Sequence, residues 1–187
     1  STIHDFEFAK FGQTEEDVRQ GLAEGTFGLW DTGEFINKAI NDYTSLGYGW
    51  ALGKYIAEER DQDSIWPAAC SSLSWHCWTR EIPLSICTSI GHDIIYEHPK
   101  CDGAKIGEAS YIDLEGIKDA VFICVGSSVT VPMVIEKAYA MAKNVARETG
   151  NNCSCYIVDL FDDKGLWNGN EPDKDDASYF IRPMKTF

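Results

Sequence analysis

The sequence predicts an α+β or α/β fold in which a mixed β-sheet of four to six strands is covered by helices. Residues 120–125 form an apolar run that reaches a Gly-Ser-Ser loop, and a long helical pattern then leads to a second apolar run at residues 155–158. The first run is apolar on both faces, which is typical of a central strand covered on each side. We therefore predict a β-loop-α-β unit at about 119–160.

The domain organisation follows from length and composition. A chain of 187 residues with 44% hydrophobic and 12% aromatic residues is most economically one globular domain, residues 1–187, with two small domains as the alternative. Within it we distinguish a helix-rich part at 14–60, a strand and aromatic-rich part at 64–125, and an acidic loop at 161–177. This order of helices and strands is the basis of the predicted fold class.

The N-terminal elements are read from apolar spacing and capping residues. Imperfect alternation of apolar residues predicts a first strand within residues 1–13. Thr14, followed by three acidic residues, then predicts a short helix capped by its hydroxyl and ended near Gly25. A further helix is predicted to begin at Asp31, with Phe35, Ile36, Ala39, Ile40 and Tyr43 along its apolar face.

Glycines at 47, 49 and 53 resemble in spacing a dinucleotide-binding fingerprint, but no strand precedes them. A pyrophosphate turn needs that strand before the helix. We therefore predict close helix packing at these glycines, with Tyr48 and Trp50 in the core. Downstream, residues 85–90 read as a strand, and three tryptophans lie nearby at positions 66, 75 and 78.

The helix of the β-loop-α-β unit is predicted from about 132 to 149. Thr130 is its candidate N-cap, and Gly150 follows its end. Its apolar face is predicted to contain Val134, Ala138, Met141, Ala142 and Val145.

A candidate ligand-binding site lies in the loop before this helix, at Gly126, Ser127, Ser128 and Thr130. Unpaired N–H groups at a helix start, together with hydroxyls, can bind phosphate or carboxylate. The alternative is a tight turn with an N-cap and no ligand. Both interpretations remain open from the sequence.

A candidate metal site is formed by His92, His98 and Cys101. Imidazole and thiolate are ligands that zinc prefers. The spacing matches no zinc finger or zinc ribbon, so the alternative is a loop of ordinary hydrogen-bonded residues. We expect no cofactor, with zinc at these three residues as the exception to be tested.

Charge and cysteine content limit the partners and the compartment. The 30 acidic and 16 basic residues give a formal charge of −14, which disfavours direct binding to nucleic acid or to anionic membranes. No apolar run is long enough for a membrane span. Seven cysteines, of which Cys87 and Cys124 lie in apolar runs, favour reduced thiols in a cytoplasmic protein.

The function class is predicted from these features together. An acidic, aromatic-rich chain without a catalytic motif is interpreted as an interaction or assembly protein that acts through a protein-binding surface. Its partner is a basic protein surface or a second copy in a homo-oligomer, and its predicted contact residues are Trp167, Glu171, Asp173, Asp175 and Asp176. The alternative is a small enzyme or ligand-binding domain that uses the 126–130 loop or the metal site.

Overall fold

The structure, a computed structural model, divides into two compact units, Ser1–Gly116 and Ile117–Phe187. We call them the N-terminal and C-terminal units and describe each by itself. The described residues are 2–14, 17–61, 66–117, 121–126, 130–146 and 154–158.

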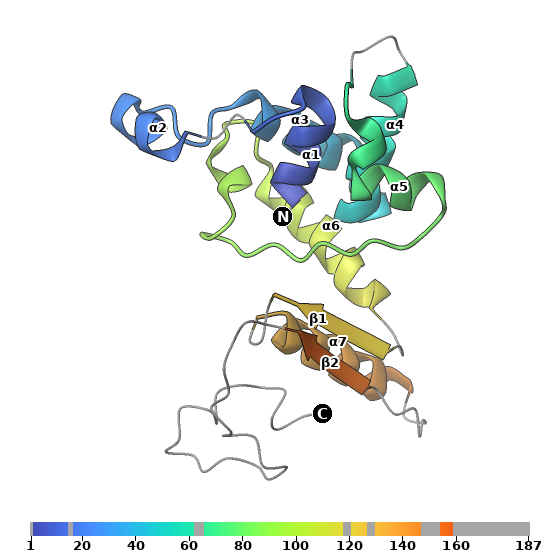
Figure 1. The fold of residues 1–187 in the computed structure, drawn as a ribbon. Helices are drawn as coiled ribbons and strands as arrows, with labels where there is room; N and C mark the ends of the chain where they lie inside the picture. Colours follow the sequence, from blue (N-terminus) through green and yellow to red (C-terminus); the bar gives the residue numbers. More distant parts are fainter. Residues whose placement is uncertain are drawn as a thin grey trace. The chain divides into compact units, whose positions relative to one another are not determined.

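The described part of the chain is mostly helical, so the predicted sheet of four to six strands, and with it the α+β or α/β class, is wrong. In the described ranges the sheet consists of two strands. The N-terminal unit contains α1 (Thr2–Phe11), α2 (Val18–Glu24), α3 (Asp31–Tyr43), η1 (Thr44–Leu46), α4 (Tyr48–Asp61), η2 (Ala69–Ser71), α5 (Leu73–Thr79), η3 (Ile94–Glu97) and α6 (Gly103–Gly116) (Figure 1).

Two segments predicted as strands have other structures, for identifiable reasons. Residues 2–11 form a helix. Phe6 and Ala9, three residues apart, are both fully buried, whereas Phe8, which a strand would place on the same face as Phe6, is 54% exposed, so burial follows the helical period. Residues 85–90 are not assigned to a strand. The Ile86 N–H, which a strand would direct to a neighbouring strand, donates instead to the Asp113 carboxylate at 2.8 Å.

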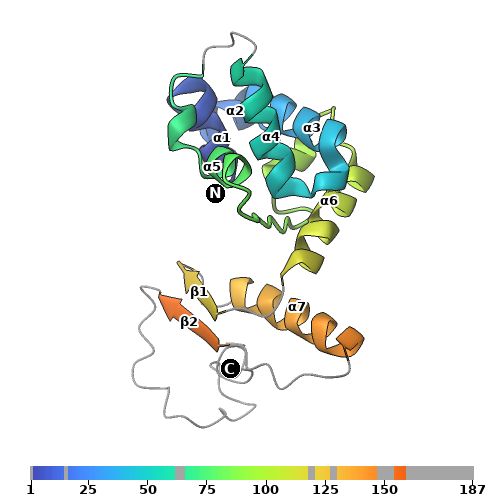
Figure 2. The same cartoon turned by 90° about the vertical axis from the view of Figure 1, so that its right-hand side faces the viewer.

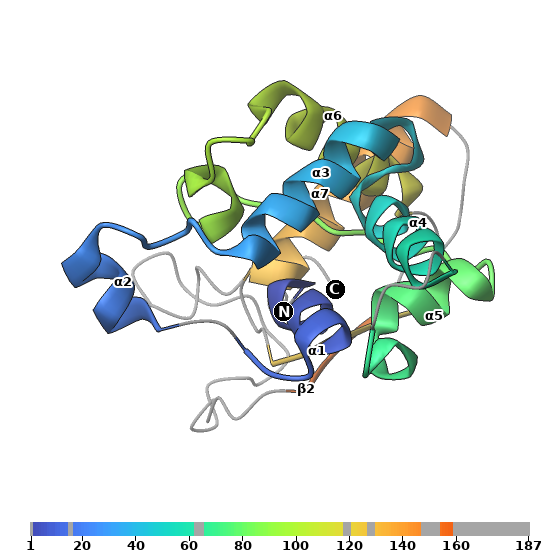
Figure 3. The ribbon, with the colours of Figure 1, turned by 90° about the horizontal axis from the view of Figure 1, so that it is seen from above.

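The core of the N-terminal unit lies between α1, α3, α4 and α6. Helix α3 begins at Asp31 as predicted, and its Ile36 and Ile40 are fully buried together with Leu52 of α4 and Ile106 of α6. Each such side chain contributes about 1.5–3 kcal/mol by leaving water. Figure 3 shows these helices from above, with α2 set apart from them, as it also is in Figure 1.

Helix α2 begins after Asp17, not after the predicted cap Thr14. The Asp17 carboxylate accepts the Gln20 N–H at 3.0 Å, and Gly25 ends the helix in the left-handed conformation. The Thr14 hydroxyl donates instead to the buried Glu7 carboxylate at 3.1 Å. The predicted glycine end of this helix is confirmed, and its predicted cap is wrong.

The C-terminal unit contains β1 (Val121–Val125), α7 (Thr130–Ala146) and β2 (Ser154–Val158). The strands are parallel, with Ile123 opposite Tyr156 and Val125 opposite Val158. Figures 1 and 2 both place α7 beside one face of this pair. Its buried residues include Ile135 and Ala138, so the apolar face is turned relative to the predicted one, which included Ala138 and not Ile135.

Candidate protein-binding surface

One face of the β1–β2 pair carries four large apolar side chains in the open. Their exposed fractions are 66% for Ile123, 74% for Val125, 60% for Tyr156 and 57% for Val158. Residues two apart in a strand share a face, and the register pairs these four across the two strands. We call these four residues the open face.

The opposite face of the pair is covered. Cys124 lies between Ile123 and Val125 in β1 and is 1% exposed, in line with the position of α7 (Figure 2). Parallel sheets usually have both faces covered by helices. A contiguous apolar patch of a few hundred Å² is about the largest found on a typical monomer and often marks an interaction site.

Sequence reasoning missed the open face because it took the apolar character of both strand faces as a sign that both are covered within the chain. The available signal was the number of helices in the unit. The predicted β-loop-α-β unit contains one helix, and one helix covers one face of a sheet.

The predicted ligand loop lies at the carboxyl end of β1. Gly126 has a positive φ of 70°, and its N–H donates to the Val158 carbonyl at 2.8 Å. This N–H is therefore engaged between the two strands and not directed at an anion. Thr130 begins α7 and is exposed, whereas Ser127 and Ser128 lie outside the described residues.

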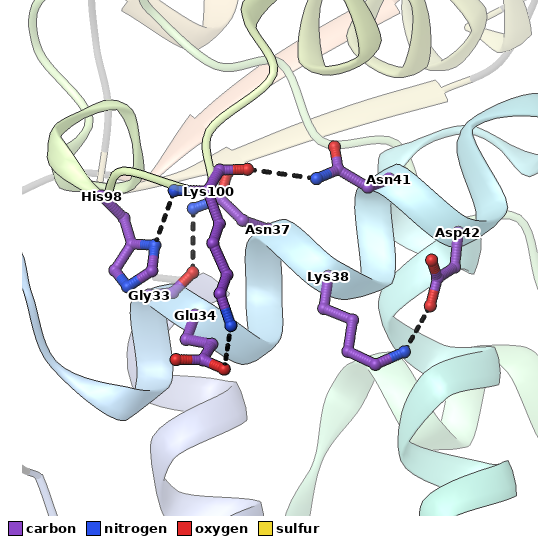
Figure 4. Close-up of polar contacts among 8 residues, drawn as sticks. All are labelled: Gly33, Glu34, Asn37, Lys38, Asn41, Asp42, His98 and Lys100. Carbon is purple, nitrogen blue, oxygen red and sulfur yellow. Dashed lines mark hydrogen bonds and ion pairs between the residues drawn. The ribbon is translucent and has the colours of Figure 1, made fainter.

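The three predicted zinc ligands have separate roles in the N-terminal unit. His98 is buried, and its Nδ1 accepts the Lys100 N–H at 3.1 Å (Figure 4). Cys101 packs against the hydrophobic core, and its N–H donates to the His98 carbonyl at 2.9 Å. His92 is exposed on the turn before η3. Among the residues with described positions, no three His, Cys, Asp or Glu side chains are grouped as a metal site.

Polar contacts of Glu34, Asn37 and Lys100, near His98, join residues 94–101 to α3 (Figure 4). We call these contacts the polar seam. Asn37, fully buried, donates to the carbonyls of Gly33 at 2.8 Å and Ile95 at 3.0 Å. Lys100 pairs with Glu34, and the hydrogen bond from Lys100 lowers the pKa of that carboxyl. The seam joins segments of the same unit, so its arrangement fits a structural role.

The glycine-rich turn at the start of α4 binds a carboxylate of the protein itself. Asp113 of α6 is 6% exposed and accepts the Gly49 N–H at 2.9 Å as well as the Ile86 N–H. A Cβ at Gly47 would lie 2.1 Å from Asp113 Oδ1. The N-terminus of α4 is thus occupied by Asp113, and the predicted packing role of these glycines is confirmed.

Burial raises the pKa of Asp113 from 3.8 to about 6, while the hydrogen bonds that it accepts from backbone N–H groups act in the opposite direction.

Two further observations concern burial. Tyr48, which directly follows Gly47, is 1% exposed, as predicted for a core residue. Of the two cysteines that lie in apolar runs of the sequence, Cys124 is buried and Cys87 is exposed.

The predicted partner-binding residues Trp167, Glu171, Asp173, Asp175 and Asp176 lie outside the described residues. In the described segments no helix has both the length and the apolarity that crossing a membrane requires.

Comparison with protein-family models, with curated proteins and with solved structures finds no match to this chain. The surfaces of the molecule are therefore the basis on which its function is inferred.

Proposed function

We propose that this chain is a protein-interaction component whose contact surface is the open face of β1 and β2, and that an apolar helix of a different protein covers this face. The observation that supports the proposal is the alignment of Ile123, Val125, Tyr156 and Val158 on one side of the strand pair, each more than half exposed. Apolar surface removed from water contributes roughly 25 cal/mol per Å².

A helix fits the open face in size. Each strand has five residues, and at a rise of about 3.3 Å per residue the face is roughly 16 Å long. A helix of about 11 residues has this length, and its diameter of about 10 Å spans two strands spaced about 4.8 Å apart. Such a helix would complete the usual arrangement of a parallel sheet between two helical layers.

A different protein fits better than a second copy of the same face. Asp159 directly follows Val158, and Asp162 and Asp163 come shortly after it. A second copy would bring the same acidic sequence to the contact, whereas the apolar face itself carries no cation to offset it. A partner helix with lysine or arginine beside its apolar stripe would instead be attracted.

The proposal is tested by titrating the purified full chain with an amphipathic helical peptide of about 18 leucine and lysine residues. We expect the methyl resonances of Ile123, Val125 and Val158 to shift, and that of the buried Ile135 to stay in place. A peptide of the same composition without an apolar face is the control for general stickiness.

Val125→Lys should weaken this binding at least about tenfold, because it places a charge within the apolar contact at its most exposed residue. The same change at Tyr111, which is 53% exposed on α6, is the matched control and should leave binding unchanged. Both variants should retain the wild-type melting temperature, since neither side chain is buried. Equal binding by the Val125→Lys variant and the wild type would refute the proposal.

A further inference from the structure

We propose that a basic and aromatic surface on α4 and α5 binds the acidic segment 171–176 of a second copy of this chain. The surface consists of Arg60, Trp75, His76 and Arg80, which we call the basic surface. It lies in the N-terminal unit and involves none of the open-face residues, so the inference goes beyond the proposed function.

The four side chains of the basic surface are in consecutive contact. The Arg60 guanidinium carbon lies 5.0 Å from the centre of the Trp75 ring, a cation–π arrangement. The Trp75 and His76 ring centres are 4.8 Å apart, and Arg80 Nη1 contacts His76 Nδ1. Aromatic rings thus hold two guanidinium groups on one surface, which reduces the conformational entropy that a binding event must remove.

The ring of His76 contacts both the Cys70 carbonyl and Arg80. Its Nε2 lies 2.7 Å from the Cys70 carbonyl oxygen, to which it can only donate. With the proton on Nε2, Nδ1 is the acceptor that receives the Arg80 N–H. The two contacts therefore agree on one tautomer, and they leave other N–H groups of the Arg80 guanidinium available to a ligand.

Neither arginine of the basic surface is in an ion pair with the described part of the chain. Lys38, Lys54, Lys100 and Lys137, by contrast, all pair with carboxylates. The two exposed guanidinium groups are therefore available to carboxylates from outside the described part of the chain. Guanidinium binds carboxylates through two parallel hydrogen bonds, so the expected ligand carries carboxylates.

The chain itself contains such a ligand. Residues Glu171, Asp173, Asp175 and Asp176 lie within six positions, with one lysine among them. A contact between the basic surface of one copy and the acidic segment of the next joins unlike surfaces, head to tail. Long-range repulsion between acidic copies is screened beyond about 8 Å at physiological ionic strength, whereas the direct pairs persist.

The test uses the full chain and two charge-reversal variants in light scattering at physiological ionic strength. One variant combines Arg60→Glu with Arg80→Glu; the other combines Glu171→Lys, Asp173→Lys, Asp175→Lys and Asp176→Lys. We expect the wild type to have a mass above the 20.9 kDa of one chain, and each variant alone to be a monomer. Mixed in equal amounts, the two variants should associate, because the acidic segment of the first meets the basic surface of the second, and the reversed charges of both are complementary as well.

Matched controls and contrary outcomes follow from the same variants. Arg19→Glu with Lys38→Glu makes an equal charge change elsewhere and should preserve self-association. A wild type that is monomeric at physiological ionic strength, or a mixture of variants that forms no complex, would overturn the inference. A complex that Val125→Lys removes and the Arg60 and Arg80 changes do not would place the copy contact on the open face, contradicting both this inference and the proposed different partner.

Discussion

Replacing Gly49 with alanine is expected to lower the free energy of unfolding by about 2–3 kcal/mol, as overpacking of a tight interior does. The added Cβ would lie 1.9 Å from the carbonyl oxygen of Leu84 and 2.7 Å from its carbonyl carbon. These are backbone atoms and cannot rotate away, so α4 or the 82–90 segment has to move. The same displacement would disturb the hydrogen bond from Gly49 to Asp113.

Urea denaturation of the Gly49→Ala variant beside Gly107→Ala measures this effect. Gly107 also lies inside a helix, α6, but no atom lies within 4 Å of its added Cβ. Gly107→Ala should therefore leave stability unchanged or raise it by about 0.5–1 kcal/mol, as alanine does in helices. Equal effects of the two substitutions would contradict the close contact between α4 and Leu84.

Asp113→Leu is expected to destabilise the protein by about 3 kcal/mol at neutral pH. Leucine has a similar size but accepts no hydrogen bond, so the N–H groups of Gly49 and Ile86 lose their partner. An unpaired buried donor costs about 1–3 kcal/mol. Thermal unfolding measures the loss, and a variant as stable as the wild type would show that Asp113 does not hold α4 to the 82–90 segment.

The stability contributed by Asp113 should depend on pH in a direction set by its raised pKa. Because the folded-state pKa of about 6 exceeds the ordinary 3.8, protonation favours the folded state. The part of this contribution that depends on protonation is complete below about pH 3.8 and is lost as the pH rises through 6, whereas the hydrogen bonds from Gly49 and Ile86 remain. The shift corresponds to about 3 kcal/mol. The stability of the wild type relative to the non-titrating Asp113→Asn variant should fall by this order between pH 4 and pH 7. A difference that is constant or rises over this range would contradict the raised pKa.

The sequence predicted elements whose signals are local. Helix α3 begins at Asp31 because acidic residues and an apolar stripe coincide there, and β1, α7 and β2 occur in the predicted order. The parts it predicted wrongly depend on distant contacts. The Ile86 N–H is taken by Asp113, 27 residues away, and this choice between a strand and a side-chain partner is not visible in residues 85–90.

The candidate sites also depend on contacts that the folded backbone determines. His92, His98 and Cys101 lie close together in the sequence, but in the structure His98 Nδ1 accepts the Lys100 N–H and Cys101 packs against the core. The basic surface was equally invisible, since Arg60 and Trp75 meet only through the packing of α4 on α5. Glycine 53, whose added Cβ would lie 2.3 Å from the Ser74 carbonyl oxygen, is what permits that packing.

The central claim, that a helix of another protein covers the open face, is tested most directly by photo-crosslinking from within that face. A benzophenone amino acid in place of Tyr156, in the full chain in its native cells, should crosslink to a partner segment with an apolar helical face. The adduct should disappear when Val125→Lys is added, and the same amino acid in place of Tyr111 should not give it. An adduct that forms equally from position 111, or that maps to the chain's own residues, would contradict the claim.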